Sequence, residues 1–140
     1  MTVIIDYGVG NLFSLKSSFA AIGEDAVVTS DPDVILSADR VVLPGVGAFS
    51  DAAEKLFETG LSETVRDAAA KGTPLLGICL GMQLLFEKSR EFGECEGLGL
   101  FKGEVLPLSG IVPSGYKIPE MGRNALHFTG EKPALFKYTE

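Results

Sequence analysis

Short apolar runs alternate with segments of helical periodicity from Thr2 to Glu87. The runs are too short for helices and rich in β-branched residues, which predicts strands. The predicted strands are Thr2–Asp6, Ala26–Thr29, Arg40–Leu43 and Leu75–Ile78. The predicted helices are Leu12–Ile22, a short one that starts at Asp31-Pro32, Asp51–Thr59, Ser62–Lys71 and Leu80–Glu87. Strands that are apolar throughout are typical of a parallel sheet with helices on both faces.

This alternation predicts an α/β fold, a flavodoxin-like open and mostly parallel sheet whose ligands bind at the carboxyl ends of the strands. After Glu87 the pattern changes, and a loop is predicted at Lys88–Glu96. Two short strands or a hairpin are predicted at Gly97–Phe101 and Glu104–Leu108, followed by a loop at Ser109–Glu120. No helix pattern closes the chain. We expect one domain, residues 1–140.

Composition narrows the class of protein without naming a function. Apolar residues at 46% and charged residues at 22% are ordinary for a soluble globular chain. The net charge of −7, without a basic cluster, argues against nucleic acid and against anionic membranes as partners. No apolar run approaches the ~20 residues of a membrane span, and the N-terminus does not resemble a signal peptide. Two cysteines without framework spacing fit a reducing compartment, so we expect a cytoplasmic protein.

The candidate chemistry centres on Gly77-Ile-Cys-Leu-Gly81, between a predicted strand and a predicted helix. A nucleophile with glycine two residues before and two after is the signature of a nucleophile elbow, a tight strained turn whose neighbours must be small. Such a turn places Cys79 at a helix N-terminus, where free N–H groups stabilise a thiolate, and makes the N–H of Leu80 a candidate oxyanion donor. A buried structural cysteine is the alternative, and the pattern alone leaves both open.

Other segments give weaker signals. Pro44-Gly-Val-Gly47 follows a strand and could supply a second oxyanion donor. The turn at Gly8–Asn11 does not match a dinucleotide fingerprint, because Phe13 stands where a third glycine is needed. His127 is a candidate general base, although an ordinary surface histidine is the more frequent case. Cys95 lies between two glutamates, which should raise its pKa and make it a poor nucleophile.

The segment Gly77–Glu87 resembles the nucleophile segment of class I (triad) glutamine amidotransferases. Three further segments, Ile4–Leu12, Leu43–Phe49 and Gly97–Phe101, are similar to the glutaminase subunits of imidazole glycerol phosphate synthase, from histidine biosynthesis. The similarity is close up to Leu108 and looser beyond it.

The resemblance implies that Cys79 attacks the carboxamide of glutamine and forms a thioester. It further implies that Leu80, Val46 and Gly47 hold the oxyanion and that Gln83 helps to bind the substrate. Ammonia would pass to a cyclase subunit with a (β/α)8 barrel, in a heterodimer. The family's reaction needs neither a metal nor another cofactor.

The chain departs from the family in two places. The family carries its base and orienting carboxylate as a late His-x-Glu pattern, which nothing here matches. The resemblance therefore implies that the domain lacks its C-terminal part and exposes an unpaired sheet edge, and we expect the chain as given to be inactive. The family usually reads His-Met-Gly-Trp-Asn where this chain reads Glu-Met-Gly-Arg-Asn. The resemblance places Asn11, Met121, Arg123 and Asn124 at the partner interface, with Arg123 in place of the tryptophan. Two alternatives stay open: another cysteine hydrolase with the same elbow, and a non-enzymatic fragment that only docks on the cyclase.

Overall fold

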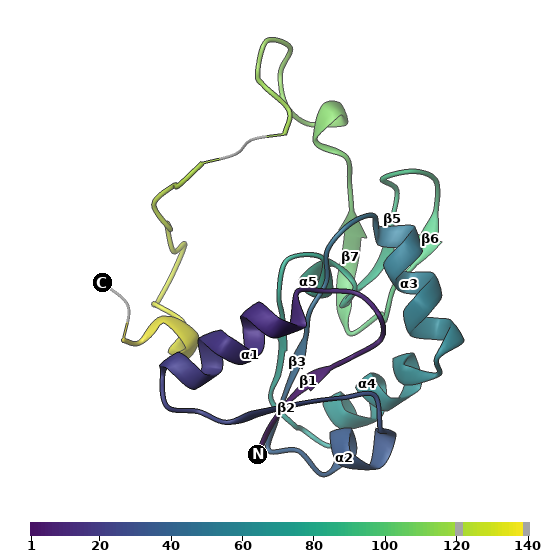
Figure 1. Ribbon diagram of the computed structural model, residues 1–140. Coiled ribbons are helices and arrows are strands. Elements are labelled where there is room, and N and C mark those ends of the chain that lie inside the picture. Colours follow the sequence, from purple (N-terminus) through teal and green to yellow (C-terminus); the bar gives the residue numbers. More distant parts are fainter. Residues whose placement is uncertain (120–121, 139–140) are drawn as a thin grey trace. The chain divides into compact units, whose positions relative to one another are not determined.

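The computed structural model describes residues 1–119 and 122–138, and these form two compact units, Met1–Pro107 and Leu108–Glu140. The first unit contains a four-stranded parallel sheet in the order β2-β1-β3-β4 (Figure 1). Its strands are β1 (Thr2–Ile5), β2 (Ala26–Thr29), β3 (Arg40–Leu43) and β4 (Leu75–Gly77). This order is that of the flavodoxin-like class of doubly wound sheets, so the structure confirms the predicted fold class.

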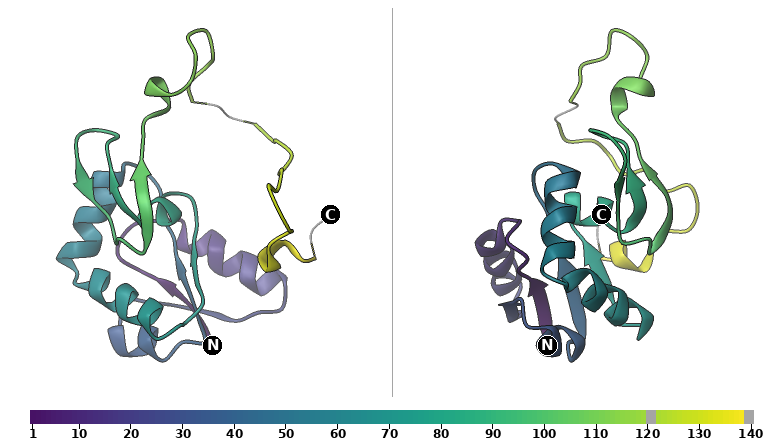
Figure 2. Two further views of the ribbon diagram at one scale, coloured as in Figure 1. Left: turned by 180° about the vertical axis from the view of Figure 1, so that it is seen from behind. Right: turned by 90° about the vertical axis from the view of Figure 1, so that its right-hand side faces the viewer.

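Helices cover both faces of this sheet. Alternate side chains of a strand point to opposite faces, so Val3 and Ile5 face one side and Ile4 the other. Helix α1 lies on the Ile4 side and α3 on the opposite side (Figure 2, right). The helices of this unit are α1 (Leu12–Ala21), α2 (Pro32–Leu36), α3 (Phe49–Glu58), α4 (Leu61–Ala70) and α5 (Leu80–Gln83).

Local capping explains where α2 begins, and α1 ends slightly earlier than predicted. The Asp31 side chain accepts a hydrogen bond of 2.9 Å from the N–H of Asp33, and Pro32 occupies the first turn of α2, as its sequence predicted. Helix α1 ends at Ala21, one residue before the predicted end. Ile22, expected on its apolar face, follows the helix and is 73% exposed.

The chain from Leu84 to Leu108 corrects the sequence prediction. Helix α5 ends at Gln83 instead of Glu87. Strand β5 (Phe86–Ser89) runs from the predicted helix into the predicted loop at Lys88–Glu96, and β6 (Cys95–Glu96) lies at the end of that loop. A single strand, β7 (Phe101–Val105), replaces the predicted pair of strands or hairpin. β5 is central in a second sheet, antiparallel to β6 and parallel to β7. The pattern failed here because these strands are short, polar and partly exposed.

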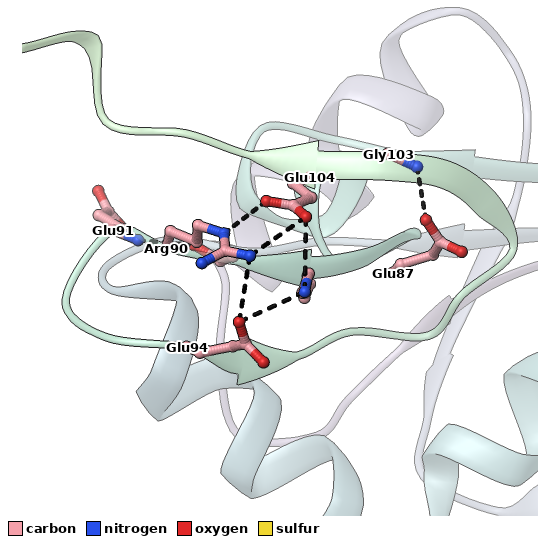
Figure 3. Close-up of polar contacts among 8 residues, drawn as sticks. Glu87, Arg90, Glu91, Glu94, Gly103 and Glu104 are labelled. Atoms are coloured by element: carbon pink, nitrogen blue, oxygen red, sulfur yellow. Dashed lines mark hydrogen bonds and ion pairs between the residues drawn. The ribbon is translucent and has the colours of Figure 1, made fainter. Parts of the chain in front are cut away.

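Ion pairs join the strands of the second sheet (Figure 3). Arg90 Nε donates to Glu104 at 2.6 Å, and its NH2 lies 3.3 Å from Glu94. Lys88 Nζ lies 3.3 Å from Glu94 and 3.4 Å from Glu104. Each cation thus contacts a carboxylate on either side of β5. These side-chain pairs across strands add to the backbone pairing of the sheet, which an apolar pattern along the strands does not mark.

In the first sheet, β4 pairs with β3 alone among the described residues, and Leu76 is 37% exposed. The second unit contains two single 3-10 turns, Leu108–Gly110 and Ala134–Phe136, and otherwise irregular chain within its described part. None of the helices in the described residues has the length and apolarity needed to span a membrane.

Candidate active site

Cys79 is exposed on a strained turn at the carboxyl end of β4. Its φ of 55° and ψ of −118° are unusual for a residue with a side chain, and it is the one non-glycine with positive φ among the described residues. Residues held in such conformations cluster at functional sites. The structure therefore places the sulfur on an elbow. It rules out the buried structural cysteine that the sequence pattern left open.

The glycines around Cys79 are required by close packing. An added Cβ at Gly77 would lie 2.5 Å from the Cα of Met82, and one at Gly81 would collide with the carbonyl oxygen of Leu43. Gly45 is equally confined, because its Cβ would lie 2.5 Å from the backbone nitrogen of Gly81. Contacts this short do not occur between real Cβ atoms and backbone. The glycines of the Gly-x-Cys-x-Gly pattern are thus needed because the tight turn leaves no room for larger side chains, as the sequence predicted.

The loop after β3 lies beside the elbow. Gly45 packs on Leu80 and Gly81, and Val46 is 54% exposed. Gly47 has a φ of 92°, and no atom lies within 4 Å of where an added Cβ would be. Within the described part of the chain, we find no intramolecular acceptor for the N–H groups of Leu80, Val46 and Gly47. Helix α5 is only four residues long, so individual N–H groups rather than a long helix dipole are available to an anion here.

A pocket of about 190 Å³ adjoins the nucleophile. Part of its wall is formed by Ile78, Cys79 and the loop residues Pro44–Val46. The rest comes from α1 and its cap, between Asn11 and Ser18. The side chain of Asn11 also caps α1, accepting a hydrogen bond of 3.1 Å from the N–H of Ser14. The predicted nucleophile, one loop residue named for the oxyanion and Asn11 therefore share one hollow.

Gln83 lies one helical turn past Cys79 and is half-buried at the end of α5. Its N–H donates to the carbonyl of Cys79 at 3.2 Å, so its backbone belongs to the elbow itself.

Cys95 has the opposite character to Cys79. It is half-buried in β6, and burial, followed by the charges of Glu96 and Glu54, raises the pKa of its thiol. The raised pKa confirms the expectation from sequence, although burial outweighs the neighbouring acids as its cause. A thiol that stays protonated is a poor nucleophile.

The other predicted residues belong to the second unit. His127, Arg123 and Asn124 are exposed there, while Met121 lies outside the described residues. Their predicted roles at a partner interface, and that of His127 as a base, stay predictions. Among the described residues, no group of three or more His, Cys, Asp or Glu side chains is placed to hold a metal ion.

One contact near the site was not predicted. The buried side chain of Tyr7 follows β1, and its hydroxyl donates to the carbonyl oxygen of Pro44 at 2.7 Å. The only local signal was an aromatic hydroxyl directly before a glycine turn.

Comparisons with known proteins agree with this geometry. Residues 3–133 match the family described as Glutamine amidotransferase class-I. The chain is 48% identical over 136 residues to "Imidazole glycerol phosphate synthase subunit HisH" of Wolinella succinogenes, covering 96% of this chain and 66% of the relative. The protein of the same name from Aquifex aeolicus is 51% identical over 135 residues, with 96% and 63% covered.

The chain spans about two thirds of the length of the curated relatives it matches. A solved structure described as "Crystal structure of glutamine amidotransferase" superposes with a TM-score of 0.63 at 21% identity. That superposition covers 74% of this chain and 55% of the other. At this identity, the likeness supports the fold alone.

Proposed function

The chain belongs to the class-I glutamine amidotransferase family, and on this premise we propose that it carries the nucleophile that releases ammonia from glutamine. The observation that carries the proposal is the exposed Cys79 on a positive-φ turn, beside a loop with unused N–H groups. The high identity to imidazole glycerol phosphate synthase subunits supports a role as the glutaminase part of that enzyme, in histidine biosynthesis.

The reaction follows from these groups. The sulfur of Cys79 attacks the side-chain carboxamide carbon of glutamine, and the carbonyl becomes an oxyanion. The N–H groups of Leu80 and of Val46 or Gly47 stabilise that oxyanion. The C–N bond then breaks, the nitrogen leaves as ammonia with a transferred proton, and a thioester forms. Water hydrolyses the thioester to glutamate and restores the thiol, while Gln83 helps to hold the substrate.

The proton transfers need a general base, and residues 1–107, which carry Cys79, contain no histidine. General acid–base catalysis contributes roughly 10²–10⁴-fold in rate. We therefore propose that these 140 residues by themselves have little or no glutaminase activity, because nothing in the sequence matches the family's His-x-Glu pair. A chain that only docks on the cyclase is the second candidate, and the same observation favours it.

The proposed partner is a cyclase subunit with a (β/α)8 barrel that takes up the ammonia inside the complex. The resemblance assigns Asn11 to this interface, and Asn11 lines the same pocket as Cys79, so an interface there would adjoin the nucleophile. Arg123, Asn124 and Met121 are proposed for the same interface from the family resemblance. Transfer inside a complex is chemically reasonable, since free ammonia is mostly protonated at neutral pH.

Alkylation of Cys79 tests the proposal without requiring turnover. In the Cys95→Ser variant, iodoacetamide should modify Cys79 alone, and L-glutamine should slow that reaction in a saturable way while L-leucine should not. Cys79→Ser in the same background should remove the modification. If glutamine gives no protection, the proposed substrate is wrong.

Turnover and docking are then measured separately. Release of glutamate, with and without a cyclase subunit from one of the relatives, reports catalysis. Co-elution with that cyclase reports docking. Binding with glutamate release no faster than that of the Cys79→Ser variant supports the docking-only candidate, whereas Cys79-dependent release supports the glutaminase.

A further inference from the structure

The base of the loop beside the elbow is held by a buried tyrosine. Tyr7 is 3% exposed, and its hydroxyl donates to the carbonyl oxygen of Pro44 across 37 residues of sequence. The donor–acceptor distance of 2.7 Å is the usual one for a good O–H···O bond. Burial raises the pKa of Tyr7 to about 12, so the hydroxyl remains a donor at any pH used to measure activity.

Two glycines confine the same part of the loop by close approach. A Cβ added at Gly10 would lie 2.9 Å from the Cβ of Pro44, so the first glycine turn packs directly on that proline. The next residue, Gly45, packs on Leu80 and Gly81 of the elbow. The peptide between Pro44 and Gly45 is therefore enclosed, and because a peptide is planar, the hydrogen bond from Tyr7 also fixes the direction of the Gly45 N–H.

The outer part of the loop has no comparable support. Val46 is exposed, and Gly47 has positive φ with no atom within 4 Å of where an added Cβ would lie. The N–H groups of these two residues are the proposed oxyanion donors, and they follow directly on the enclosed peptide. Their direction relative to Cys79 hence depends on how firmly the base of the loop is held.

We propose that Tyr7 is a positioning residue, which orients the donors of the Pro44–Gly47 loop toward the carbonyl oxygen of a substrate bound at Cys79. This inference rests on the proposed function. Tyr7 acts through Pro44 and has no contact with the reacting atoms. Tyr7→Phe keeps the ring in its packed place but leaves the buried Pro44 carbonyl without its donor.

A pair of electrophiles separates loop geometry from thiol reactivity. The first is a glutamine analogue with a chloromethyl ketone in place of the carboxamide. The Cys79 sulfur forms a bond to its methylene carbon, the C–Cl bond breaks and chloride leaves, while donors at the ketone oxygen accelerate the displacement. The second is iodoacetamide, from which iodide leaves and which is small enough to react without being oriented.

The experiment uses the full 140-residue chain in the Cys95→Ser background. Tyr7→Phe should lower the rate constant for the chloromethyl ketone by roughly tenfold, equivalent to about 1.4 kcal/mol, and leave the iodoacetamide rate unchanged. Tyr116→Phe, an exposed tyrosine in the second unit, should change neither rate. Amide hydrogen exchange should quicken at the buried Gly45 in Tyr7→Phe. Exchange in β1 and β3 should stay unchanged, whereas a general loss of stability would quicken it there as well.

Two results would overturn the inference. Unchanged exchange at Gly45 would mean that the hydrogen bond does not hold the loop. Faster exchange with an unchanged ratio of the two labelling rates would mean that the loop's order does not matter for the ketone oxygen. Failure of the proposed function shows separately. In that case, L-glutamine would not slow the reaction of the wild-type chain with the glutamine analogue. The exchange result would still test the role of Tyr7.

Discussion

Gly81 shows most directly how a single residue supports the site, because an added Cβ would collide with the carbonyl oxygen of Leu43. Gly81→Ala should lower the free energy of unfolding by roughly 1–3 kcal/mol, as overpacking does, since the obstacle is backbone and cannot rotate away. It should also slow alkylation of Cys79 by moving the elbow. Urea denaturation and a labelling time course measure the two effects.

Gly110→Ala is the matched control for Gly81→Ala. No atom lies within 4 Å of a Cβ placed at Gly110, and its φ is not positive. This variant should change the free energy of unfolding by no more than about 0.5 kcal/mol. Equal losses in the two variants would show that close packing at Gly81 is not what makes glycine necessary there.

At the scale of elements, the sequence predicted β1–β4 and α1–α4 well. Each of these strands is a continuous apolar run, and the longer helices carry an apolar face or a recognisable start and stop. The strands of the second sheet have no such signal. Lys88 pairs with Glu96 on one side and Glu104 on the other, and a pairing between distant polar residues leaves no local periodicity.

The candidate site likewise has parts that the sequence predicts and a contact that it does not. Cys79 and the Pro44–Gly47 loop both follow strands of one parallel sheet, so the topology rule for such sheets is enough to bring them together. The contact of Tyr7 with Pro44 could not be predicted, because it joins two loops across 37 residues through one hydroxyl. Patterns along a sequence report which face a side chain occupies, and not which atom it meets.

The ion pairs of the second sheet make a pH-dependent contribution (Figure 3). The hydrogen bond from Arg90, followed by the charges of Arg90 and Lys88, lowers the pKa of Glu104. A carboxylate with a lowered pKa in the folded state stabilises the fold above its unfolded pKa of about 4.3. That stabilisation is lost as the pH falls through the folded value.

Glu104→Gln should therefore be less stable than the wild type at pH 7, and the difference should close as the pH falls below about 4. It should also shrink in 1 M salt, where the Debye length is about 3 Å. Thermal unfolding at several pH values and two salt concentrations measures this. Glu58→Gln, on α3 and away from the network, serves as control, and a difference that persists at low pH would contradict the assignment.

At the scale of the whole molecule, the two units differ in how much their side chains are covered. The first has an extensive core, with both faces of its sheet covered, whereas every described residue of the second is exposed except Val112 and Phe136. Exposed backbone in irregular chain is the preferred substrate of proteases. Trypsin should therefore cut first after Lys117 or Arg123.

Mass spectrometry of a brief digest identifies the first cut. The same segment should show fast amide hydrogen exchange, while β1 and β3 should exchange slowly, because local stability follows burial and packing. A first cut after Lys16 or Lys55, within α1 or α3, would contradict this difference between the units.

The backbone conformation of Cys79 favours glycine, whereas the proposed chemistry requires a cysteine side chain. With a φ of 55° and a ψ of −118°, residue 79 would be unstrained only as glycine. Cys79→Gly should accordingly be more stable than Cys79→Ala by roughly 1 kcal/mol, as urea denaturation can show, and equally inert. At Cys95, which lies within a strand, Cys95→Ala should instead be more stable than Cys95→Gly. A population of variants selected for folding alone would thus drift away from cysteine at residue 79, and only selection for the reaction would retain the sulfur.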